Sequence, residues 1–334
     1  MIRSERPITV TYSRGEHPES THEIHGVIVR GGTVIDGWGD IDARYFPRSA
    51  FKPFQALAVI HSGAADAHGL EPRHLALSMA SHSGEPKHTE AVMAWLEAIG
   101  LDEAALHCGS HRPFAEAAGD DLVRKGQPFT ARHHNCSGKH TGMLTLMRHR
   151  DLPANYETYE HPVQVAIRDI ASRFMGCDLD QAPWGYDGCA VPNYAVTLTA
   201  LATGYANLTT PPDGYGDAAG RLLAAWAAHP DLVAGSNRFD TALMLATGSR
   251  VLSKQGAEGV QGALIPETGT AIMLKSADGS QRGTEQAMRT LIERLEDSPT
   301  IDAAVLSEHW PAASGNITNA RGDVIGRVAI DIPN

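Results

Sequence analysis

The 334-residue chain has few cysteines, no long apolar run and no excess of positive charge. Its four cysteines form no C-x-x-C pair, and thiols this sparse are typical of a reducing compartment rather than of a disulfide scaffold. No segment approaches the ~18 apolar residues that a membrane span requires. The N-terminus shows no apolar stretch of the secretory type. We therefore expect a cytoplasmic protein that does not cross a membrane.

The charge balance is acidic, because 39 Asp and Glu residues oppose 28 Lys and Arg residues for a net charge of −11. A nucleic-acid-binding surface needs clustered positive charge, and so does docking on an anionic membrane. The composition predicts neither kind of partner. With 42% hydrophobic residues, a chain of this length can bury a large core and hold a closed site for a small molecule.

Both ends of the chain have the pattern of β-strands, and the middle has the pattern of helices. Strands are expected at 8–12, 25–30, 33–37, 251–254, 259–265, 270–275, 316–319 and 324–331. Helices are expected at 53–68, 86–99, 114–124, 138–148, 162–175, 194–205, 218–229 and 284–295. This order predicts an α+β fold with an antiparallel sheet built from both ends and flanked by helices. We expect one catalytic unit over residues 1–334, with 1–45 and 250–334 in the sheet and 50–245 mainly helical.

Ser49 and Lys52 form an S-x-x-K pattern within the segment PRSAFKPFQ. On a helix these positions lie on one face, so the two side chains can meet. A lysine activates a serine hydroxyl only when it is neutral, and burial or a second cation lowers its pKa. The alternative is that Ser49 caps a helix and Lys52 is an ordinary charge.

Two later segments give this pair a context. Ser81, in SMASHSGEP, could relay protons, although turn and capping roles are the alternative. Lys254, in VLSKQGA, lies at the end of a strand, and S-x-x-K with a later K-x-G is the frame of serine β-lactamases and penicillin-binding proteins. A second lysine there helps to keep the first one neutral. Lys275 is a rival for this role.

Thiols and amines gather in two further segments. Cys136, Lys139 and His140 lie in HHNCSGKHTG, the densest polar run in the chain, and Cys189 lies in GYDGCAVP. Thiolates favour zinc or another soft metal, but two cysteines are too few for a structural zinc site. The residues leave open whether Lys139 or His140 would add a ligand. A redox pair and a buried core thiol are the alternatives.

Five motifs in order, PRSAFKPFQ, SMASHSGEPKH, HNCSGKHTGM, GYDGCAVPNYAV and SKQGAEGV, make the chain resemble the rhizobial-type (class 3) L-asparaginases, or asparaginase II family. The resemblance covers essentially the whole chain. It implies a β-lactamase-like fold, hydrolysis of L-asparagine to L-aspartate and ammonia, and a homodimer.

The resemblance also implies roles for eleven residues. The catalytic residues would be Ser49, Lys52, Ser81 and Lys254. The substrate pocket would be lined by Arg48, Asn135, His140 and Asp187. Zinc would be held by Cys136, Lys139 and Cys189, and we expect it to be structural or to orient the substrate rather than to generate hydroxide. Ser49 is favoured over Ser81 as the nucleophile, and the KQGAEG context favours Lys254 over Lys275.

Three other functions are compatible with the motifs. The first is a zinc-dependent amidohydrolase whose catalytic metal is held by Cys136 and Cys189. The second is a β-lactamase-like peptidase or penicillin binder, and the third is a ligand sensor without enzymatic activity. The effect of metal chelation on turnover separates the expected function from the first, covalent labelling of Ser49 by a penicillin separates it from the second, and ammonia release from asparagine and glutamine separates it from the third.

Overall fold

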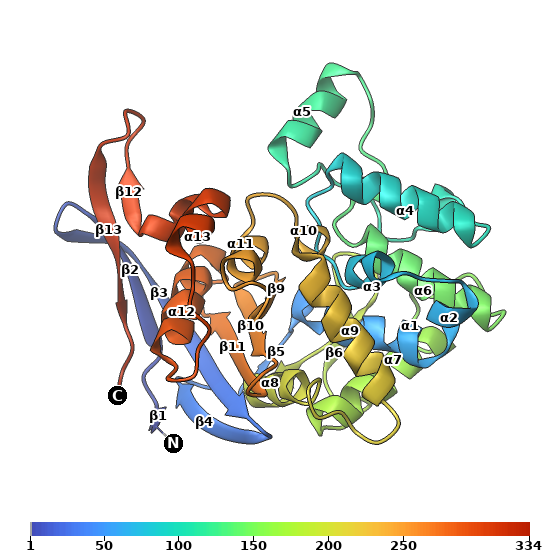
Figure 1. Cartoon of the computed structure of the whole chain (residues 1–334), viewed down its shortest axis with the longest axis horizontal. Coiled ribbons are helices and arrows are strands. Elements are labelled where there is room, and N and C mark those ends of the chain that lie inside the picture. The colour runs from blue at the N-terminus through green and yellow to red at the C-terminus, as the bar shows by residue number, and fades with distance from the viewer. Residues whose placement is uncertain (1) are drawn as a thin grey trace. The chain divides into compact units, whose positions relative to one another are not determined.

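Strands from both ends of the chain pair into one nine-stranded sheet within the described residues 2–334 of this computed structural model (Figure 1). Its strands are β1 (Ile2–Ser4), β2 (Ile8–Arg14), β3 (His17–Arg30), β4 (Thr33–Trp38), β9 (Leu252–Gly256), β10 (Val260–Ile265), β11 (Thr270–Ser276), β12 (Asn316–Thr318) and β13 (Val324–Asp331). The path runs β12-β13-β2-β3-β11-β10-β9, with β4 paired to β3 and β1 paired in parallel to β4. The antiparallel pairing of β13 with β2 and of β11 with β3 joins the two chain ends. The predicted α+β architecture is confirmed.

The chain divides into two compact units. The sheet unit consists of Met1–Ala50, Ala195–Thr210 and Asn237–Asn334, and the helical unit consists of Phe51–Tyr194 and Pro211–Ser236. The expectation of one catalytic unit over residues 1–334 stays a prediction.

Helices cover both faces of the sheet in the sheet unit. They are α8 (Leu198–Ala206), α11 (Phe239–Ala246), α12 (Gln281–Arg294) and α13 (Ala303–His309), with a short turn η4 (Pro311–Ser314) and a small ribbon of β5 (Arg44–Tyr45) and β8 (Val196–Thr197). Along β10, Gly262 faces the ring of Tyr205 on α8, whereas Ala263 belongs to the core under α12. Because neighbouring residues of a strand point to opposite faces, α8 and α12 cover different sides.

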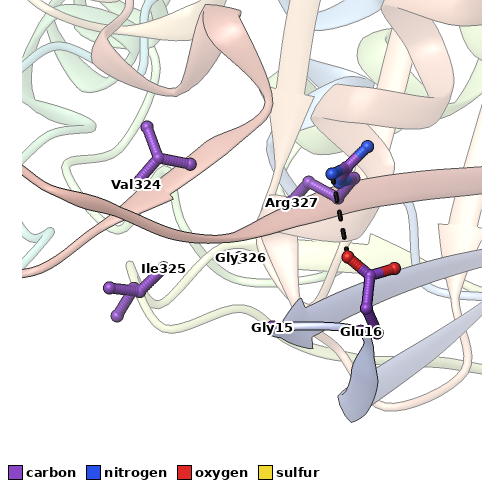
Figure 2. Close-up of a pocket in the computed structure, with 6 residues that line it drawn as sticks. All are labelled: Gly15, Glu16, Val324, Ile325, Gly326 and Arg327. Atoms are coloured by element: carbon purple, nitrogen blue, oxygen red, sulfur yellow. Dashed lines mark ion pairs between the residues drawn. The ribbon is translucent and has the colours of Figure 1, made fainter.

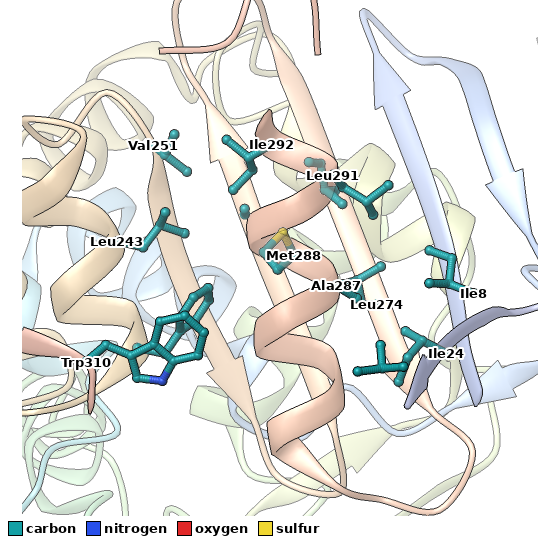
Figure 3. Close-up of a cluster of buried hydrophobic side chains, with 14 of the residues drawn as sticks. Ile8, Ile24, Leu243, Val251, Leu274, Ala287, Met288, Leu291, Ile292 and Trp310 are labelled. Carbon is teal, nitrogen blue, oxygen red and sulfur yellow. The ribbon is translucent and has the colours of Figure 1, made fainter. Parts of the chain in front are cut away.

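The main apolar core of the sheet unit lies under α11, α12 and α13. Figure 3 shows Met288, Leu291 and Ile292 of α12 directed at side chains of the strands, among them Leu274 and Ile24. All of these side chains are buried. Burial of a large aliphatic side chain contributes about 1.5–3 kcal/mol, so this core stabilises the sheet to which Lys254 belongs.

The helical unit is built around α1, whose residues Lys52–Ile60 are all buried. Its elements are α1 (Lys52–His61), α2 (Ala64–Ala67), α3 (Pro72–Ser78), α4 (Pro86–Ala98), η2 (Glu103–Ala105), α5 (Glu116–Arg124), η3 (Ala131–His133), α6 (Ser137–His149), α7 (Pro162–Met175), β6 (Trp184–Tyr186), β7 (Pro192–Tyr194), α9 (Gly216–Ala228) and α10 (Pro230–Val233). Helices α6, α7 and α9 pack on α1. A Cβ at Gly138 would overlap with the carbonyl of Leu77, so glycine lets α6 approach α3 closely.

Several boundaries differ from the sequence prediction. The helix expected over 53–68 ends at His61, because Gly63 adopts a left-handed conformation with φ of 82° before α2 begins. The helix expected over 194–205 begins only at Leu198, after two short strands, and the Thr197 side chain accepts a hydrogen bond from the backbone N–H of Ala200. Helices α11 and α13 were not predicted.

The tips of two hairpins meet at one end of the sheet and enclose a shallow pocket (Figure 2). The backbone N–H of Gly15 donates to the carbonyl oxygen of Ile325 over 2.7 Å. A Cβ at Gly326 would overlap with the carbonyl of Ser13, so glycine is required there. None of the predicted site residues lines this pocket.

Among residues 2–334, no helix combines the length and the hydropathy that crossing a bilayer requires.

Candidate active site

Lys52 and Ser81 meet in the interior of the helical unit. The Nζ of Lys52, the first residue of α1, donates to the Oγ of Ser81 over 3.0 Å and to the carbonyl oxygen of Ala80 over 2.6 Å. Both side chains are buried. Backbone hydrogen bonds to other segments fix the loop that carries Ser81. The N–H of Ser81 donates to the carbonyl oxygen of Val233, and the N–H of His82 donates to the carbonyl oxygen of Asn135. The pair is therefore held in place before any ligand arrives.

The pKa of Lys52 is lowered chiefly by burial. The Cys136 thiolate opposes this shift, and the ammonium group of Lys139 adds to it. Burial favours the neutral form of an amine, and so does a second cation nearby. The helical unit thus supplies both conditions that a lysine needs to act as a base.

Cys136, Lys139 and Cys189, here called the thiol–lysine cluster, lie beside this pair. Lys139 Nζ donates to Cys189 Sγ over 2.8 Å, and all three side chains are buried. A hydrogen bond from the Cys189 thiol lowers the pKa of Cys136 well below its usual value, and Lys52 and Lys139 add to this effect. Burial alone would lower the pKa of Lys139, but the neighbouring sulfur atoms of Cys189 and Cys136 outweigh it and raise that pKa.

The thiol–lysine cluster is the site at which the expected zinc ion would bind. No group of three or more His, Cys, Asp or Glu side chains among residues 2–334 is placed to hold a metal. The cluster offers two soft sulfur atoms and an amine, which suits zinc provided that Cys189 and Lys139 release their protons when the ion binds. The three residues fit the role by their chemistry, and zinc binding stays a prediction.

Three of the predicted substrate-binding residues border the same cluster. The Oδ1 of Asn135 lies 3.7 Å from Cys136 Sγ, and the Oδ2 of Asp187 lies 3.8 Å from Cys189 Sγ. His140 follows Lys139 on α6 and is fully buried, and burial together with Lys139 lowers its pKa well below the usual value, so the ring is neutral. Asn135, His140 and Asp187 therefore gather in the helical unit.

Ser49 and Arg48 belong to the sheet unit, in the short helix η1 (Arg48–Phe51) that leads directly into α1. Arg48 has a positive φ of 51°, which is rare for a residue with a side chain and is often found at functional sites. Its guanidinium lies 4.0 Å from a carboxylate oxygen of Glu258. The backbone N–H of Ala50 donates to the carbonyl oxygen of Pro47, which closes the turn around Ser49.

Lys254 is fully buried on β9, and this strand packs against the Ser49 turn. A Cβ at Gly256 would overlap with the carbonyl oxygen of Pro47, so the glycine of the K-x-G pattern permits this close approach. Tyr205 of α8 packs beside Gly262, the β10 partner of Lys254, and its hydroxyl donates to the carbonyl oxygen of Ala50 over 2.7 Å. The sheet unit therefore holds Ser49 and Lys254 on one connected framework.

The rival Lys275 lies on β11 and is only partly buried. Burial lowers its pKa, and its Nζ donates to the carbonyl oxygen of Ser276.

One residue that supports this framework was not predicted from the sequence. Asp240, at the start of α11, is buried and accepts from Ser253 Oγ over 2.7 Å, from the Gln255 N–H over 2.7 Å and from Gln261 Nε2 over 2.8 Å. Ser253 and Gln255 flank Lys254, so one carboxylate fixes the strand on both sides of it. A lone Asp in a helix carries no motif that could have indicated this role.

The sequence model of the L-asparaginase II family matches residues 10–330. The chain belongs to the L-asparaginase II family. The family places it among the enzymes that hydrolyse amides, which agrees with the expected hydrolase. No curated protein matches the chain.

Several solved structures align with most of the chain at low identity. A β-lactamase from Mycobacterium bovis is 13% identical over 86% of this chain and 94% of its own, with a TM-score of 0.43. A hydrolase with promiscuous acyltransferase activity is 13% identical over 80% and 93%, with a TM-score of 0.41. An octameric penicillin-binding protein homologue from Pyrococcus abyssi is 11% identical over 87% and 76%, with a TM-score of 0.36. Family membership, and not these similarities, bears on what the chain does.

Proposed function

We propose that the protein hydrolyses the side-chain amide of L-asparagine to L-aspartate and ammonia through a serine acyl-enzyme. The observation that carries this proposal is the buried contact between Lys52 Nζ and Ser81 Oγ, in surroundings that lower the pKa of the lysine. Membership of the L-asparaginase II family supports the choice of substrate.

Ser49 is the nucleophile of this proposal, and Lys52 is its base. Neutral Lys52 takes the Ser49 hydroxyl proton, and the Oγ attacks the carboxamide carbon. The proton then passes to the leaving nitrogen, ammonia departs, and water hydrolyses the ester by the reverse proton path. Ser81 relays protons to and from Lys52, and Lys254 stabilises the negative charge that develops in the transition state.

The protein has side chains that complement the α-carboxylate and the α-ammonium group of the substrate. The guanidinium of Arg48 suits the α-carboxylate as a bidentate donor, and the carboxylate of Asp187 suits the α-ammonium group. Asn135 and His140 supply neutral hydrogen-bonding groups. Zinc, when bound by Cys136, Lys139 and Cys189, would supply Lewis acidity that orients the substrate, and no step of the proposal runs through it. A homodimer in the cytoplasm remains the expectation from the resemblance and the composition.

The test is ammonia release from L-asparagine and L-glutamine by the wild-type protein and by Ser49→Ala. The proposal expects release from asparagine that Ser49→Ala abolishes while the fold, followed by circular dichroism, is retained. Release from neither amide overturns the function. Complete loss of turnover at saturating substrate after chelation would instead support a catalytic metal, and covalent labelling of Ser49 by a penicillin would support a penicillin binder.

A further inference from the structure

His140 has one ring nitrogen with a partner and one without. Its Nδ1 lies 2.7 Å from the hydroxyl oxygen of Tyr156. Its Nε2 is buried and has no hydrogen-bond partner among the described residues. Buried polar atoms of folded proteins are nearly always hydrogen-bonded, so an unpaired ring nitrogen in the interior indicates that a ligand completes its bonding.

The Tyr156 hydroxyl determines which nitrogen carries the proton. The backbone N–H of His107 donates to this hydroxyl oxygen over 2.9 Å, so the oxygen already accepts one hydrogen bond. Tyr156 is fully buried, and His140 Nδ1 is the acceptor within reach of its own proton. A neutral imidazole that accepts at Nδ1 must carry its hydrogen on Nε2. The free position of His140 is therefore an N–H donor.

The thiol–lysine cluster lies near this ring, because the charges of Lys139 and Cys136 both act on the pKa of His140. His140 follows Lys139 on α6, and both side chains are fully buried in the helical unit. The family resemblance implies that His140 binds substrate, but it does not identify the residues that orient the imidazole ring. Tyr156, between α6 and α7, and the backbone of His107, after η2, hold the ring from two loops outside the motifs.

We propose that Tyr156 is a positioning residue that fixes His140 in the Nε2–H tautomer, so that Nε2–H donates to an acceptor oxygen of the substrate. This inference rests on the proposed function for the identity of the substrate, since a carboxylate or carboxamide oxygen of asparagine is the acceptor. The hydrogen bond is made to the bound substrate, and its loss is expected to raise KM more than it lowers kcat.

The first measurement is the 15N NMR spectrum of the imidazole nitrogens in the full-length protein, with His140 assigned by comparison with His140→Gln. The wild-type protein is expected to show a protonated Nε2 and an accepting Nδ1. L-aspartate, the product, is expected to shift the Nε2–H resonance. This measurement needs no turnover, so it tests the tautomer even if the protein fails to hydrolyse asparagine. A wild-type His140 protonated on Nδ1 would overturn the inference.

The second measurement compares Tyr156→Phe with Tyr12→Phe in asparagine kinetics. Tyr12 is a matched control, because it is a buried tyrosine of the sheet unit whose hydroxyl donates to the carbonyl oxygen of Arg282 over 3.0 Å. Tyr156→Phe is expected to raise KM about 10- to 100-fold and to populate the other tautomer, whereas Tyr12→Phe leaves KM unchanged. In a His140→Gln background, whose amide N–H replaces the Nε2 donor, Tyr156→Phe should add little. Unchanged KM and tautomer in Tyr156→Phe would refute the role of Tyr156.

Discussion

The amine of Lys52 donates to the hydroxyl of Ser81 over 3.0 Å, and the two groups are buried together in the helical unit. An exposed lysine would remain protonated at neutral pH, and its contact with a serine would have no chemical consequence. Here burial and the neighbouring Lys139 both lower the pKa of Lys52. The contact therefore joins a base to a hydroxyl that can carry its proton.

The pH dependence of turnover should report the protonation of Lys52. Activity requires the neutral amine, so kcat/KM is expected to fall as pH decreases through the pKa of Lys52. The folded-state pKa lies below the ordinary 10.5, so the falling limb also lies below that value. Lys139→Met removes a like charge, which raises the pKa of Lys52 and should move the limb to higher pH. A pH profile of kcat/KM for both proteins, measured without added metal, checks this, and a limb that stays in place or moves to lower pH would count against Lys52 as the base.

Replacement of Lys52 itself should remove the base. Lys52→Met is expected to lower kcat by about 10²- to 10⁴-fold. Lys87 is a matched control in the same unit, because it is only partly buried and pairs with Glu85 and Asp231 at the surface. Lys87→Met should leave kcat within about twofold of wild type, since partly exposed ion pairs contribute little. Ammonia release measures both, and equal effects of the two substitutions would contradict the assignment.

Asp240→Ala should weaken the sheet unit around Lys254. The substitution leaves the Gln255 N–H, the Ser253 hydroxyl and the Gln261 amide without their shared acceptor, at an expected cost of about 3 kcal/mol. Turnover should fall as well, because Ser253 and Gln255 flank Lys254 on β9. Urea unfolding and asparagine kinetics check both effects.

Asp331→Ala is the control for this substitution, because its side chain is 67% exposed and pairs with Arg6 at a distance of 3.5 Å. It should change the free energy of unfolding by less than about 0.5 kcal/mol. If Asp240→Ala were equally mild, the carboxylate would not hold β9.

Gly256→Ala should displace the turn that carries Arg48 and Ser49. The added Cβ would overlap with the carbonyl oxygen of Pro47, so either β9 or the turn must shift, and we expect a loss of about 1–3 kcal/mol in stability together with reduced kcat. Gly220→Ala is the opposite case, because Gly220 lies on an exposed face of α9 with open space around it. That change should stabilise the protein by about 0.5–1 kcal/mol. Thermal unfolding and kinetics of the two variants decide the matter, and an active, stable Gly256→Ala protein would exclude the proposed close approach.

Stability should depend on pH through Glu285. Burial and the charge of Asp240 raise the pKa of this carboxyl from 4.5 to about 7. A carboxyl group whose pKa is raised by folding stabilises the folded state at pH values below its pKa in the unfolded chain. This contribution is lost as the pH rises through about 7, the pKa in the folded state. Glu285→Gln should therefore unfold like the wild type near about pH 4 and be more stable by up to about 3 kcal/mol near about pH 8. Urea titrations at both pH values test this, and an equal difference at the two would be inconsistent with the raised pKa.

The fold could be predicted from the sequence where patterns are local. Alternation of apolar residues and glycine-containing turns indicated the terminal strands and predicted that both chain ends share one antiparallel sheet. The order of its strands, with β13 beside β2, was not predicted. Helix α11 escaped prediction because it is short and almost entirely buried, so it shows little amphipathic contrast.

The residues of the candidate site were predicted by motif, whereas their supporting contacts were not. The sequence suggested Lys254 as the cation that keeps Lys52 neutral, and the helical unit contains Lys139 in that electrostatic role. The carboxylate of Asp240 accepts from the N–H of Gln255, 15 residues along the chain, and the hydroxyl of Tyr156 bonds to the ring of His140, 16 residues away. Such contacts depend on tertiary packing, and no spacing rule in a single sequence specifies them.

The most direct test of the serine–lysine mechanism is rapid quenching of the wild-type protein during turnover of L-asparagine, followed by peptide mass spectrometry. The account predicts an aspartyl ester on the peptide that contains Ser49, absent from Ser49→Ala and from Lys52→Met. Turnover of asparagine by Ser49→Ala, or an ester found on the Ser81 peptide instead, would contradict it.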